Sequence, residues 1–537
     1  MKKIFLIKVK SIEDFFEKKI VFTSAAFLIV TSLLLIKLGN LLVDQTLWGE
    51  DGPIFISQSR ELGAQSIWKE HAGYLNLYPR LSSYFASFFD IGLTPIIFLI
   101  FCGLSYTALV YVIINKGTFL KKSRLESLLL AILIIFQPHR DEVFFNITNA
   151  QWWIGSALCI FVLVYFNGQE KNSLFKSTII FVASLTGPFS LFLLPLLAFN
   201  LVILRNWRDR KLVYIPVLLG AFIQLIFVLN SQRIYSGEWI FEDQLQHLLT
   251  GIKTLIFFGS DLKLLRFFSI ILWIMILSQL IRVGINFVKK NKNNAQNIQA
   301  ILLLFAAAFY YASPIFLLIV PAEILSPLGS GARYFFITYS LIFFAAWLLF
   351  SNNKVLRITV LSIILLIDCL SNPFKWAEDR VNHQFQSYVE FSKYNKDVVI
   401  KNNPYAIPDA LHWKIILPNR ELKKISGEMG FDLSWKKDEV SANLGHRTFF
   451  VELFEKCNDS KHIGIELKTN STKSGVLQLA WGNEEIFLTK NFLDEQFFSG
   501  ESKIYFALPS SKAKHLLLKS SKVEDDFEIK STKLYCL

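Results

Sequence analysis

The chain has 537 residues, of which 53% are hydrophobic and 18% are charged, and its mean hydropathy is +0.41. This composition excludes an ordinary soluble enzyme and is typical of a polytopic membrane protein. The net charge of +13 does not predict nucleic-acid binding, because the Lys and Arg residues lie in short clusters between apolar runs, the pattern that orients membrane spans.

The first 19 residues, MKKIFLIKVKSIEDFFEKK, contain six Lys and predict a cytoplasmic basic amphipathic segment. No small-residue cleavage site follows the next apolar run, so that run is expected to remain as a membrane anchor.

Apolar runs recur up to Leu370 and predict an α-helical membrane domain over 20–371, since a helix needs about 20 apolar residues to cross the bilayer core. About eleven spans are expected, at 20–43, 92–115, 125–137, 151–167, 176–186, 188–204, 212–230, 264–287, 298–320, 333–350 and 354–371.

The apolar run 177–204 is predicted to be a helical hairpin that breaks at Gly187-Pro188. Glycine permits the turn, and proline removes a backbone donor. The first arm of this hairpin and the run 125–137 are too short to cross fully, and irregular backbone at membrane depth requires surrounding protein or a wet cavity. A water-filled vestibule that opens outward is therefore expected.

The distribution of basic residues predicts the orientation of the spans. With the N-terminus in the cytoplasm, the inside segments hold 22 Lys and Arg, whereas the outside segments before residue 334 are longer and hold nine. This orientation places the polar segments 47–53, 139–153, 230–239 and 321–335 on the outer face, together with everything after Ser371. The segment 241–263 is typical of an amphipathic helix on that surface.

Residues 372–537 predict an extracytoplasmic, soluble, β-rich domain of sandwich-like form. The stretches HIGIELKT, GVLQLAWG, SKIYFAL, KHLLLKSS and FEIKSTKLYCL show the two-residue alternation of strands, and turn signals such as KSG and FSGES separate them. Cys457 and Cys536 both lie in this domain and could form a disulfide in an oxidising compartment.

The stretch LWGEDGPIFI (47–56) contains the first candidate catalytic residues, Glu50 and Asp51. A carboxylate in an outer loop can act as a general base that accepts a proton from an attacking hydroxyl group. The alternative is a structural role, in which these acids cap a helix running from about Pro53 to Leu62. The sequence alone leaves both interpretations open.

The segment HRDEVFFNITNAQWW (139–153) contains many groups that could bind a sugar. Trp152 and Trp153 suit either an interfacial aromatic belt or stacking on a sugar face. Asp141 and Glu142 could bind a metal ion, but no cluster at metal-ligand spacing accompanies them, so no metal or other cofactor is indicated.

Arg333, in SGARYFF, stands at the outer end of a predicted span. It could extend its charge to the interface, as isolated arginines commonly do, or bind a phosphate through its paired donors. Arg140 and Arg233 are the other outer candidates for a phosphate contact.

Five stretches together resemble the polytopic GT-C glycosyltransferases, and most of all the bacterial serotype-converting O-antigen glucosyltransferases. They are WGEDGPIF (48–55), AGYLNLYPRL (72–81), NITNAQWW (146–153), SGARYFF (330–336) and YAIPDALHWKIILP (405–418). The resemblance implies a GT-C-like membrane fold and an inverting transfer of a sugar, expected to be glucose. The donor would be a polyprenyl-phosphate sugar, and the acceptor a surface glycan such as the O-antigen of lipopolysaccharide, on the outer side of the bacterial cytoplasmic membrane.

The resemblance also implies roles for individual residues. Asp51 would be the catalytic base with Glu50 as its neighbour, and Arg333, with Arg140 and Arg233, would bind the donor phosphate. The sugar or acceptor would contact Asp141, Glu142, Asn146, Asn149, Gln151, Trp152, His71 and Tyr74. The implied partners are the lipid-linked donor, the glycan acceptor and membrane lipid.

Two alternative functions remain open. An O-antigen polymerase or ligase would use a lipid-diphosphate donor. A lipid-linked glycan flippase or other transporter would place charges within its spans and show related halves, whereas the polar residues here gather in loops of one side and no repeat is visible.

Overall fold

The computed structural model describes part of the chain, and the statements that follow concern that part. The described residues are 28–35, 46–119, 124–137, 143–164, 173–204, 207–231, 241–257, 262–288, 295–317, 331, 333–350, 354–371, 384–395, 398, 400–401, 414–415, 430–432, 436–437, 448–452, 462–471, 475–482, 492–497, 500–509, 515–520 and 528–537.

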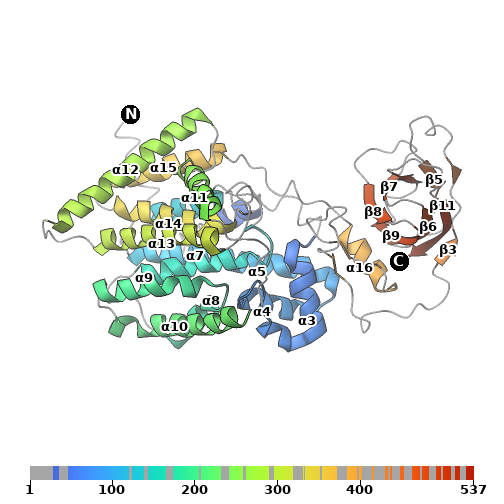
Figure 1. Cartoon of the computed structure of the whole chain (residues 1–537), viewed down its shortest axis with the longest axis horizontal. Helices are drawn as coiled ribbons and strands as arrows, with labels where there is room; N and C mark the ends of the chain where they lie inside the picture. Colours follow the sequence, from blue (N-terminus) through green and yellow to red (C-terminus); the bar gives the residue numbers. More distant parts are fainter. Residues whose placement is uncertain are drawn as a thin grey trace. The chain divides into compact units, whose positions relative to one another are not determined.

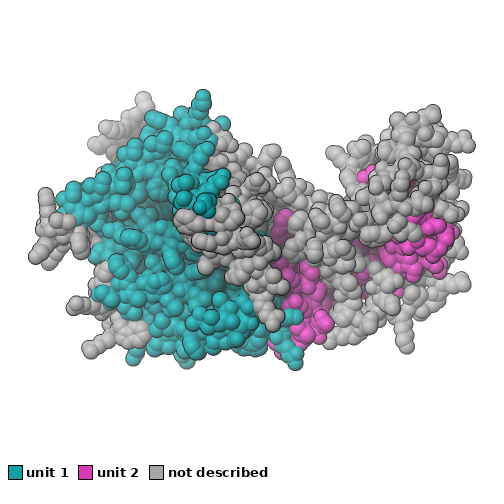
Figure 2. Space-filling view, in the orientation of Figure 1, with its two compact units in different colours: residues 1–39, 65–82, 97–377 teal, residues 40–64, 83–96, 378–537 magenta. Residues whose placement is uncertain are grey.

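The chain divides into two compact units, and each is discontinuous in sequence (Figure 2). Unit 1 comprises Met1–Gly39, Gln65–Ser82 and Ile97–Ala377. Unit 2 comprises Asn40–Ala64, Ser83–Ile96 and Glu378–Leu537.

Unit 1 is helical (Figure 1). Its main helices are α5 (Thr94–Phe119), α6 (Arg124–Phe136), α7 (Ala150–Leu163), α8 (Leu174–Ser184), α9 (Phe189–Leu204), α10 (Trp207–Asn230), α11 (Phe241–Ile256), α12 (Lys263–Val288), α13 (Ala295–Leu317), α14 (Arg333–Leu349) and α15 (Lys354–Ser371). All except α11 coincide with predicted spans, and α11 coincides with the predicted amphipathic helix. Of the predicted span 20–43, the described residues 28–35 are helical.

Four described helical segments are long and apolar enough to cross a membrane: Ile91–Lys116, Arg210–Asn230, Lys263–Asn286 and Gln296–Ile315. Shorter apolar helices accompany them, and the larger number of eleven crossings stays a prediction. The helix α12 exposes Phe267, Ile270, Ile274 and Leu277 along one side. An apolar face of this extent is suited to lipid, so these are the helices of an integral membrane protein.

The shorter helices α7 and α14 form the centre of unit 1. Every residue of α14 from Phe335 to Leu349 is buried, and α7 is buried over nearly its whole length. Their aromatic side chains interlock, with the ring of Trp153 4.6 Å from that of Phe336 and 4.2 Å from that of Tyr106. The 14 residues of α7 rise only about 21 Å, which suits a helix covered by protein on all sides.

The predicted helical hairpin is confirmed. The helix α8 ends at Ser184 and α9 begins at Phe189, with the predicted break at Gly187-Pro188 between them. Gly187 has a φ of +80°, a conformation that L side chains rarely adopt. A Cβ atom there would also lie 2.7 Å from the Phe189 ring and 2.7 Å from Oε1 of Gln151, so the turn requires glycine for both reasons.

Unit 2 begins with a continuous run of helical turns. A 3-10 turn (η2, Gly49–Asp51) leads into a π-helical turn (η3, Gly52–Ile56) and then into α3 (Ser57–Leu62). The unit also contains the short turn η5 (Ile91–Leu93) and the helix α16 (Phe385–Ser392). The helix predicted over Pro53–Leu62 thus exists, but the helical run begins earlier, at Gly49.

The remainder of unit 2 is β-structure, as predicted (Figure 1). The strands are β1 (Ile400–Lys401), β2 (Lys414–Ile415), β3 (Gly430–Asp432), β4 (Lys436–Lys437), β5 (Thr448–Glu452), β6 (His462–Ser471), β7 (Gly475–Gly482), β8 (Phe492–Phe497), β9 (Gly500–Pro509), β10 (His515–Ser520) and β11 (Glu528–Cys536). Two antiparallel sheets have the orders β4-β5-β10-β7-β8 and β3-β11-β6-β9, and β1 pairs with β2.

The sheets owe their stability to alternating apolar side chains. In β6 the residues Ile463, Ile465 and Leu467 are buried, and in β7 the residues Leu477 and Leu479 are buried. Cys536, at the end of β11, is disulfide-bonded. Cys457 lies outside the described residues, so the Cys457–Cys536 bridge stays a prediction.

Candidate functional site

The stretch AGYLNLYPRL is built into unit 1 by pairing with the turn between α8 and α9. The Gly187 amide donates to the Leu75 carbonyl at 3.1 Å, and the Leu77 amide donates to the Leu185 carbonyl at 3.1 Å. The Tyr78 amide donates to Oγ1 of Thr186 at 3.2 Å. This short antiparallel pairing fixes the loop on the membrane unit.

Gln224, a fully buried residue of α10, ties both partners of this pairing together. Its side-chain amide donates to the carbonyls of Leu75 at 2.7 Å and Gly187 at 3.0 Å, and its Oε1 accepts from the Leu75 amide at 3.0 Å. Sequence reasoning missed this residue. The feature that could have identified it is an amide side chain inside an otherwise apolar span. Burying such a group costs free energy unless its hydrogen bonds are made.

A tight hairpin presents His71 and Tyr74. The two residues exchange backbone hydrogen bonds of 2.9 and 3.3 Å, and the central residues Ala72 and Gly73 both have positive φ values, as a type I′ turn requires. Arg80 stabilises this hairpin by donating to the carbonyls of Lys69 at 3.0 Å and Glu70 at 3.1 Å, the two residues that precede His71. Burial lowers the pKa of Arg80 to about 10. Its Nε and Nη2 groups are used for these hydrogen bonds to the backbone.

Tyr74 and Gln151 lie together in the folded unit, as the predicted sugar site requires. The Gln151 side-chain amide donates to the Tyr74 hydroxyl at 3.4 Å. Gln151 is 3% exposed, and its Oε1 has no hydrogen-bond partner among the described residues. Asn76 is fully buried beside the same turn, and neither of its side-chain polar atoms has a hydrogen-bond partner in the part of the chain that the structure describes. Buried amides of this kind are suited to a ligand that supplies hydroxyl groups.

The NITNAQWW stretch forms the turn that starts α7. Oδ1 of Asn146 accepts from the Asn149 amide at 2.8 Å, and Oδ1 of Asn149 accepts from the Trp152 indole at 3.2 Å. Asn146 and Asn149 therefore build the turn and orient Trp152. Trp153 is fully buried and donates to the Val143 carbonyl at 2.9 Å, so it belongs to the core and not to an interfacial aromatic belt.

Trp152 connects this turn to Arg333 through an aromatic neighbour. The rings of Trp152 and Tyr334 meet edge to face at 5.6 Å, and the Arg333 guanidinium lies 5.1 Å from the Tyr334 ring. Arg333 and Ala150 are the first residues of α14 and α7. Helix starts favour negative charge, so an arginine at one of them suits a phosphate group.

Seven predicted site residues thus gather in unit 1 through a series of contacts. In the hairpin, His71 pairs with Tyr74, and the Tyr74 hydroxyl accepts from Gln151. The neighbouring Trp152 contacts the Tyr334 ring, which in turn contacts Arg333. We call this group the polar cluster, and it consists of His71, Tyr74, Asn146, Asn149, Gln151, Trp152 and Arg333 together with Asn76 and Tyr334.

Glu50 and Asp51 belong to unit 2 and are described with it. Asp51 is 1% exposed, whereas Glu50 is half-buried. Asp51 has helical backbone angles and its side chain makes no capping hydrogen bond, so it does not act as a side-chain cap. Glu50 and Asp51 do lie in the first turn of the helical run, as the structural interpretation expected. Its role as a catalytic base stays a prediction.

Several predicted site residues lie outside the described part of the chain: Arg140, Asp141, Glu142 and Arg233. Of YAIPDALHWKIILP, only Lys414–Ile415 is described, as β2. Among the described residues, no group of three or more His, Cys, Asp or Glu side chains could hold a metal ion.

Comparison with known proteins gives one distant likeness. No protein-family model and no curated protein matches the chain. The chain is similar to the cryo-EM structure of the arabinosyltransferase EmbB from Mycobacterium smegmatis over 95% of its own length and 64% of that chain, with 11% identity and a TM-score of 0.25. It spans less than two thirds of that protein, and a likeness at this level carries no argument about activity.

Proposed function

We propose that this chain is a membrane glycosyltransferase that transfers a sugar, expected to be glucose, from a polyprenyl-phosphate donor to a surface glycan such as O-antigen. The observation that carries the proposal is the polar cluster. In it, buried amide groups with polar atoms that lack a hydrogen-bond partner within the described residues, aromatic rings and an arginine at a helix start come together from segments that the charge pattern assigns to one face of the membrane.

The chemistry of the cluster suits the two parts of a lipid-linked sugar. The amide groups of Gln151 and Asn76 can exchange hydrogen bonds with sugar hydroxyls, and Trp152 offers a ring for the apolar face of the sugar. Arg333 can hold the phosphate, whose negative charge increases as the sugar leaves. A transporter would need only the binding of the lipid, whereas a transferase also needs a base.

Asp51 is the proposed base. The acceptor hydroxyl oxygen attacks the anomeric carbon, the bond from that carbon to the phosphate oxygen breaks, and polyprenyl phosphate leaves with the bonding electrons. The hydroxyl proton passes to the Asp51 carboxylate. Because the acceptor displaces the phosphate directly, the configuration at the anomeric carbon inverts.

The decisive experiment uses the full chain purified into lipid nanodiscs and supplied with candidate polyprenyl-phosphate sugars and an O-antigen acceptor. Mass spectrometry of the lipids should show polyprenyl phosphate appearing in step with glycosylated acceptor. Consumption of a lipid-diphosphate donor alone would instead favour a polymerase or ligase. Movement of an intact lipid-linked glycan across the bilayer without transfer would favour a flippase.

A further inference from the structure

The helix α16 lies between two parts of unit 2 that are distant in sequence. It precedes the strands of the two larger sheets in sequence, and side chains on both of its sides make specific contacts within the unit. Residues 90–92 on one side and the strands β6, β9 and β11 on the other hold it in place.

The contacts with the strands leave little freedom for movement. Oγ of Ser387 lies 3.0 Å from Nδ1 of His462, and the Tyr388 hydroxyl donates to the Tyr505 carbonyl at 3.2 Å. The Phe391 ring packs against Tyr535, with ring centroids 5.0 Å apart. Gly464 sits under that ring, where a Cβ atom would come within 2.7 Å of it. The helix is therefore seated firmly on the β-structure.

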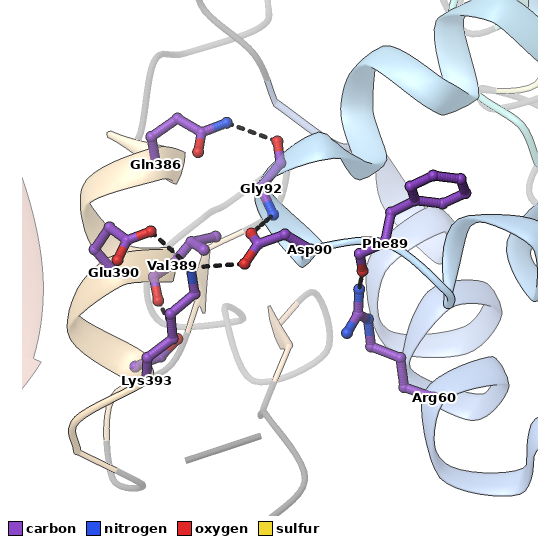
Figure 3. A network of polar contacts seen from close by, with 9 residues as sticks. Arg60, Phe89, Asp90, Gly92, Gln386, Val389, Glu390 and Lys393 are labelled. Carbon is purple, nitrogen blue, oxygen red and sulfur yellow. Dashed lines mark hydrogen bonds and ion pairs between the residues drawn. The ribbon is translucent and has the colours of Figure 1, made fainter. Parts of the chain in front are cut away.

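The opposite contacts are polar and hold the segment that precedes α5 (Figure 3). The Gln386 side chain donates to the Gly92 carbonyl at 2.8 Å, and Nζ of Lys393 lies 2.8 Å from Oδ2 of Asp90. Asp90 uses its other oxygen to accept from the Gly92 amide at 2.8 Å, which caps η5. Lys393 is 9% exposed, and Glu390 of the same helix is its second partner at 2.6 Å.

One further contact reaches the helical run that contains Asp51. The Arg60 guanidinium donates to the carbonyl of Phe89, the residue before Asp90, as Figure 3 shows. Arg60 belongs to α3, which continues without a break from the turns at Gly49–Asp51 and Gly52–Ile56. A series of side-chain contacts therefore runs from the β-structure through α16 and Asp90 to the helical run around Asp51.

From this series of contacts we infer that Lys393 and Asp90 are positioning residues for Asp51. The β-structure would then act as a fixed support for the segment that contains Asp51. This inference rests on the proposed function insofar as Asp51 is the base, but the mechanical coupling can be measured without any reaction.

The coupling is tested by hydrogen–deuterium exchange on the full chain in nanodiscs. Lys393→Met removes the ammonium group, and Asp90→Asn keeps the cap of η5 while removing the charge. Both should raise amide exchange in residues 49–62 about threefold to tenfold, and Lys393→Arg should restore the wild-type rate. Faster exchange confined to residues 90–96 and 385–395 would overturn the inference.

Two control variants remove other ion pairs of unit 2, each 2.6 Å long. Glu390→Gln breaks the 2.6 Å contact within α16 and leaves Asp90 in place, and Lys530→Met breaks the 2.6 Å pair with Glu501 in the β-structure. Neither should change exchange in residues 49–62. If either control raises that exchange as much as Lys393→Met does, general loosening explains the effect and the inference fails.

Activity provides the second readout. Lys393→Met and Asp90→Asn should each lower kcat about threefold to tenfold with the KM for the donor unchanged, and the double variant should lose no more than the worse single one. A raised KM with normal kcat would contradict a role in positioning the base. If the wild-type chain transfers no sugar from any polyprenyl-phosphate donor, the proposed function fails, whereas the exchange measurement still decides the coupling.

Discussion

Arg357 and Glu126 form a paired contact between α15 and α6 that is buried from solvent. Nε and Nη2 of Arg357 donate to the two carboxylate oxygens of Glu126 at 2.7 and 3.1 Å, and the Trp347 indole donates to the same carboxylate at 3.1 Å. Glu126 is fully buried and Arg357 is 7% exposed. One set of buried hydrogen bonds therefore joins three helices of unit 1, α6, α14 and α15.

We predict that breaking this pair destabilises unit 1. Removing one member of a buried ion pair typically costs about 3–5 kcal/mol, because the remaining charge loses its partner. Glu126→Leu should therefore lower the melting temperature of the detergent-solubilised protein more than the double variant Glu126→Leu/Arg357→Met, which leaves no buried charge. A double variant that melts no higher than the single one would contradict this explanation.

The second prediction concerns Asp51. Asp51→Asn keeps the shape of the side chain but removes its basicity, so turnover should fall roughly 10²- to 10⁴-fold, the range typical of losing a positioned general base. The helical run should survive, since the Asp51 side chain makes no capping hydrogen bond. The variant must first be shown to insert and to bind donor.

Glu50→Gln is the matched control for that experiment. Glu50 is less buried than Asp51, and we expect Glu50→Gln to retain much more activity. If Glu50→Gln is inactive while Asp51→Asn turns over normally, Glu50 is the base. If both variants are active, neither acid is the base.

The third prediction concerns donor binding by Arg333. Arg333→Ala should weaken the apparent affinity for the polyprenyl-phosphate donor about tenfold or more, since hydrogen bonds to charged groups contribute roughly 1.5–3 kcal/mol. Lys354→Ala, at the start of α15, removes a positive charge outside the polar cluster and should have little effect. Equal losses, measured in membranes with matched protein levels, would exclude Arg333 as the phosphate contact.

The fourth prediction is a pH dependence of the contact between Asp90 and Lys393. Burial opposes ionisation of Asp90, but hydrogen bonds from Lys393 and the Gly92 amide outweigh it and hold the pKa of Asp90 below its usual value. Burial likewise opposes the charge of Lys393, but its carboxylate partners raise the pKa of Lys393 above its usual value. The pair therefore stabilises the folded state between the ordinary pKa of Asp, about 3.9, and that of Lys, about 10.4.

This contribution disappears as the pH falls through the lowered pKa of Asp90 or rises through the raised pKa of Lys393. The melting temperature of Asp90→Asn should therefore lie below that of the wild type by a constant amount from about pH 5 to pH 9, and the gap should close below about pH 4. A gap that changes between pH 5 and pH 9 would show that another group is responsible.

Local patterns in the sequence predict the helices and strands well. In the run 177–204, Gly187-Pro188 predicts the position at which the helix breaks. The stretch GVLQLAWG coincides with β7, because its alternation of apolar and polar residues matches a half-buried strand. The apolar runs of α7 and α14 also appear clearly. Only the structure explains why these two helices are short. Surrounding helices bury them, so their length does not have to match the thickness of the bilayer.

The site is harder to predict because it depends on distant residues. Tyr74 and Gln151 are 77 positions apart, and Gln224 is 149 positions from Leu75. No periodicity relates residues at these distances. The sequence therefore predicts which segments contain polar side chains. It cannot distinguish Trp152, which contacts the Tyr334 ring beside Arg333, from Trp153, which is buried in the core.

The bond between Gln386 and Gly92 joins residues that are 294 positions apart, and this has a consequence for biosynthesis. At ribosomal rates of about 5–20 residues per second, the segment around Gly92 waits roughly 15 to 60 s before its partner helix exists. Throughout that interval the turns around Asp51 lack the support of α16, and a chain that stops at Ser371 never acquires it. The contact of α16 with the segment before α5 therefore forms only late in translation, and a chain that ends before α16 lacks it.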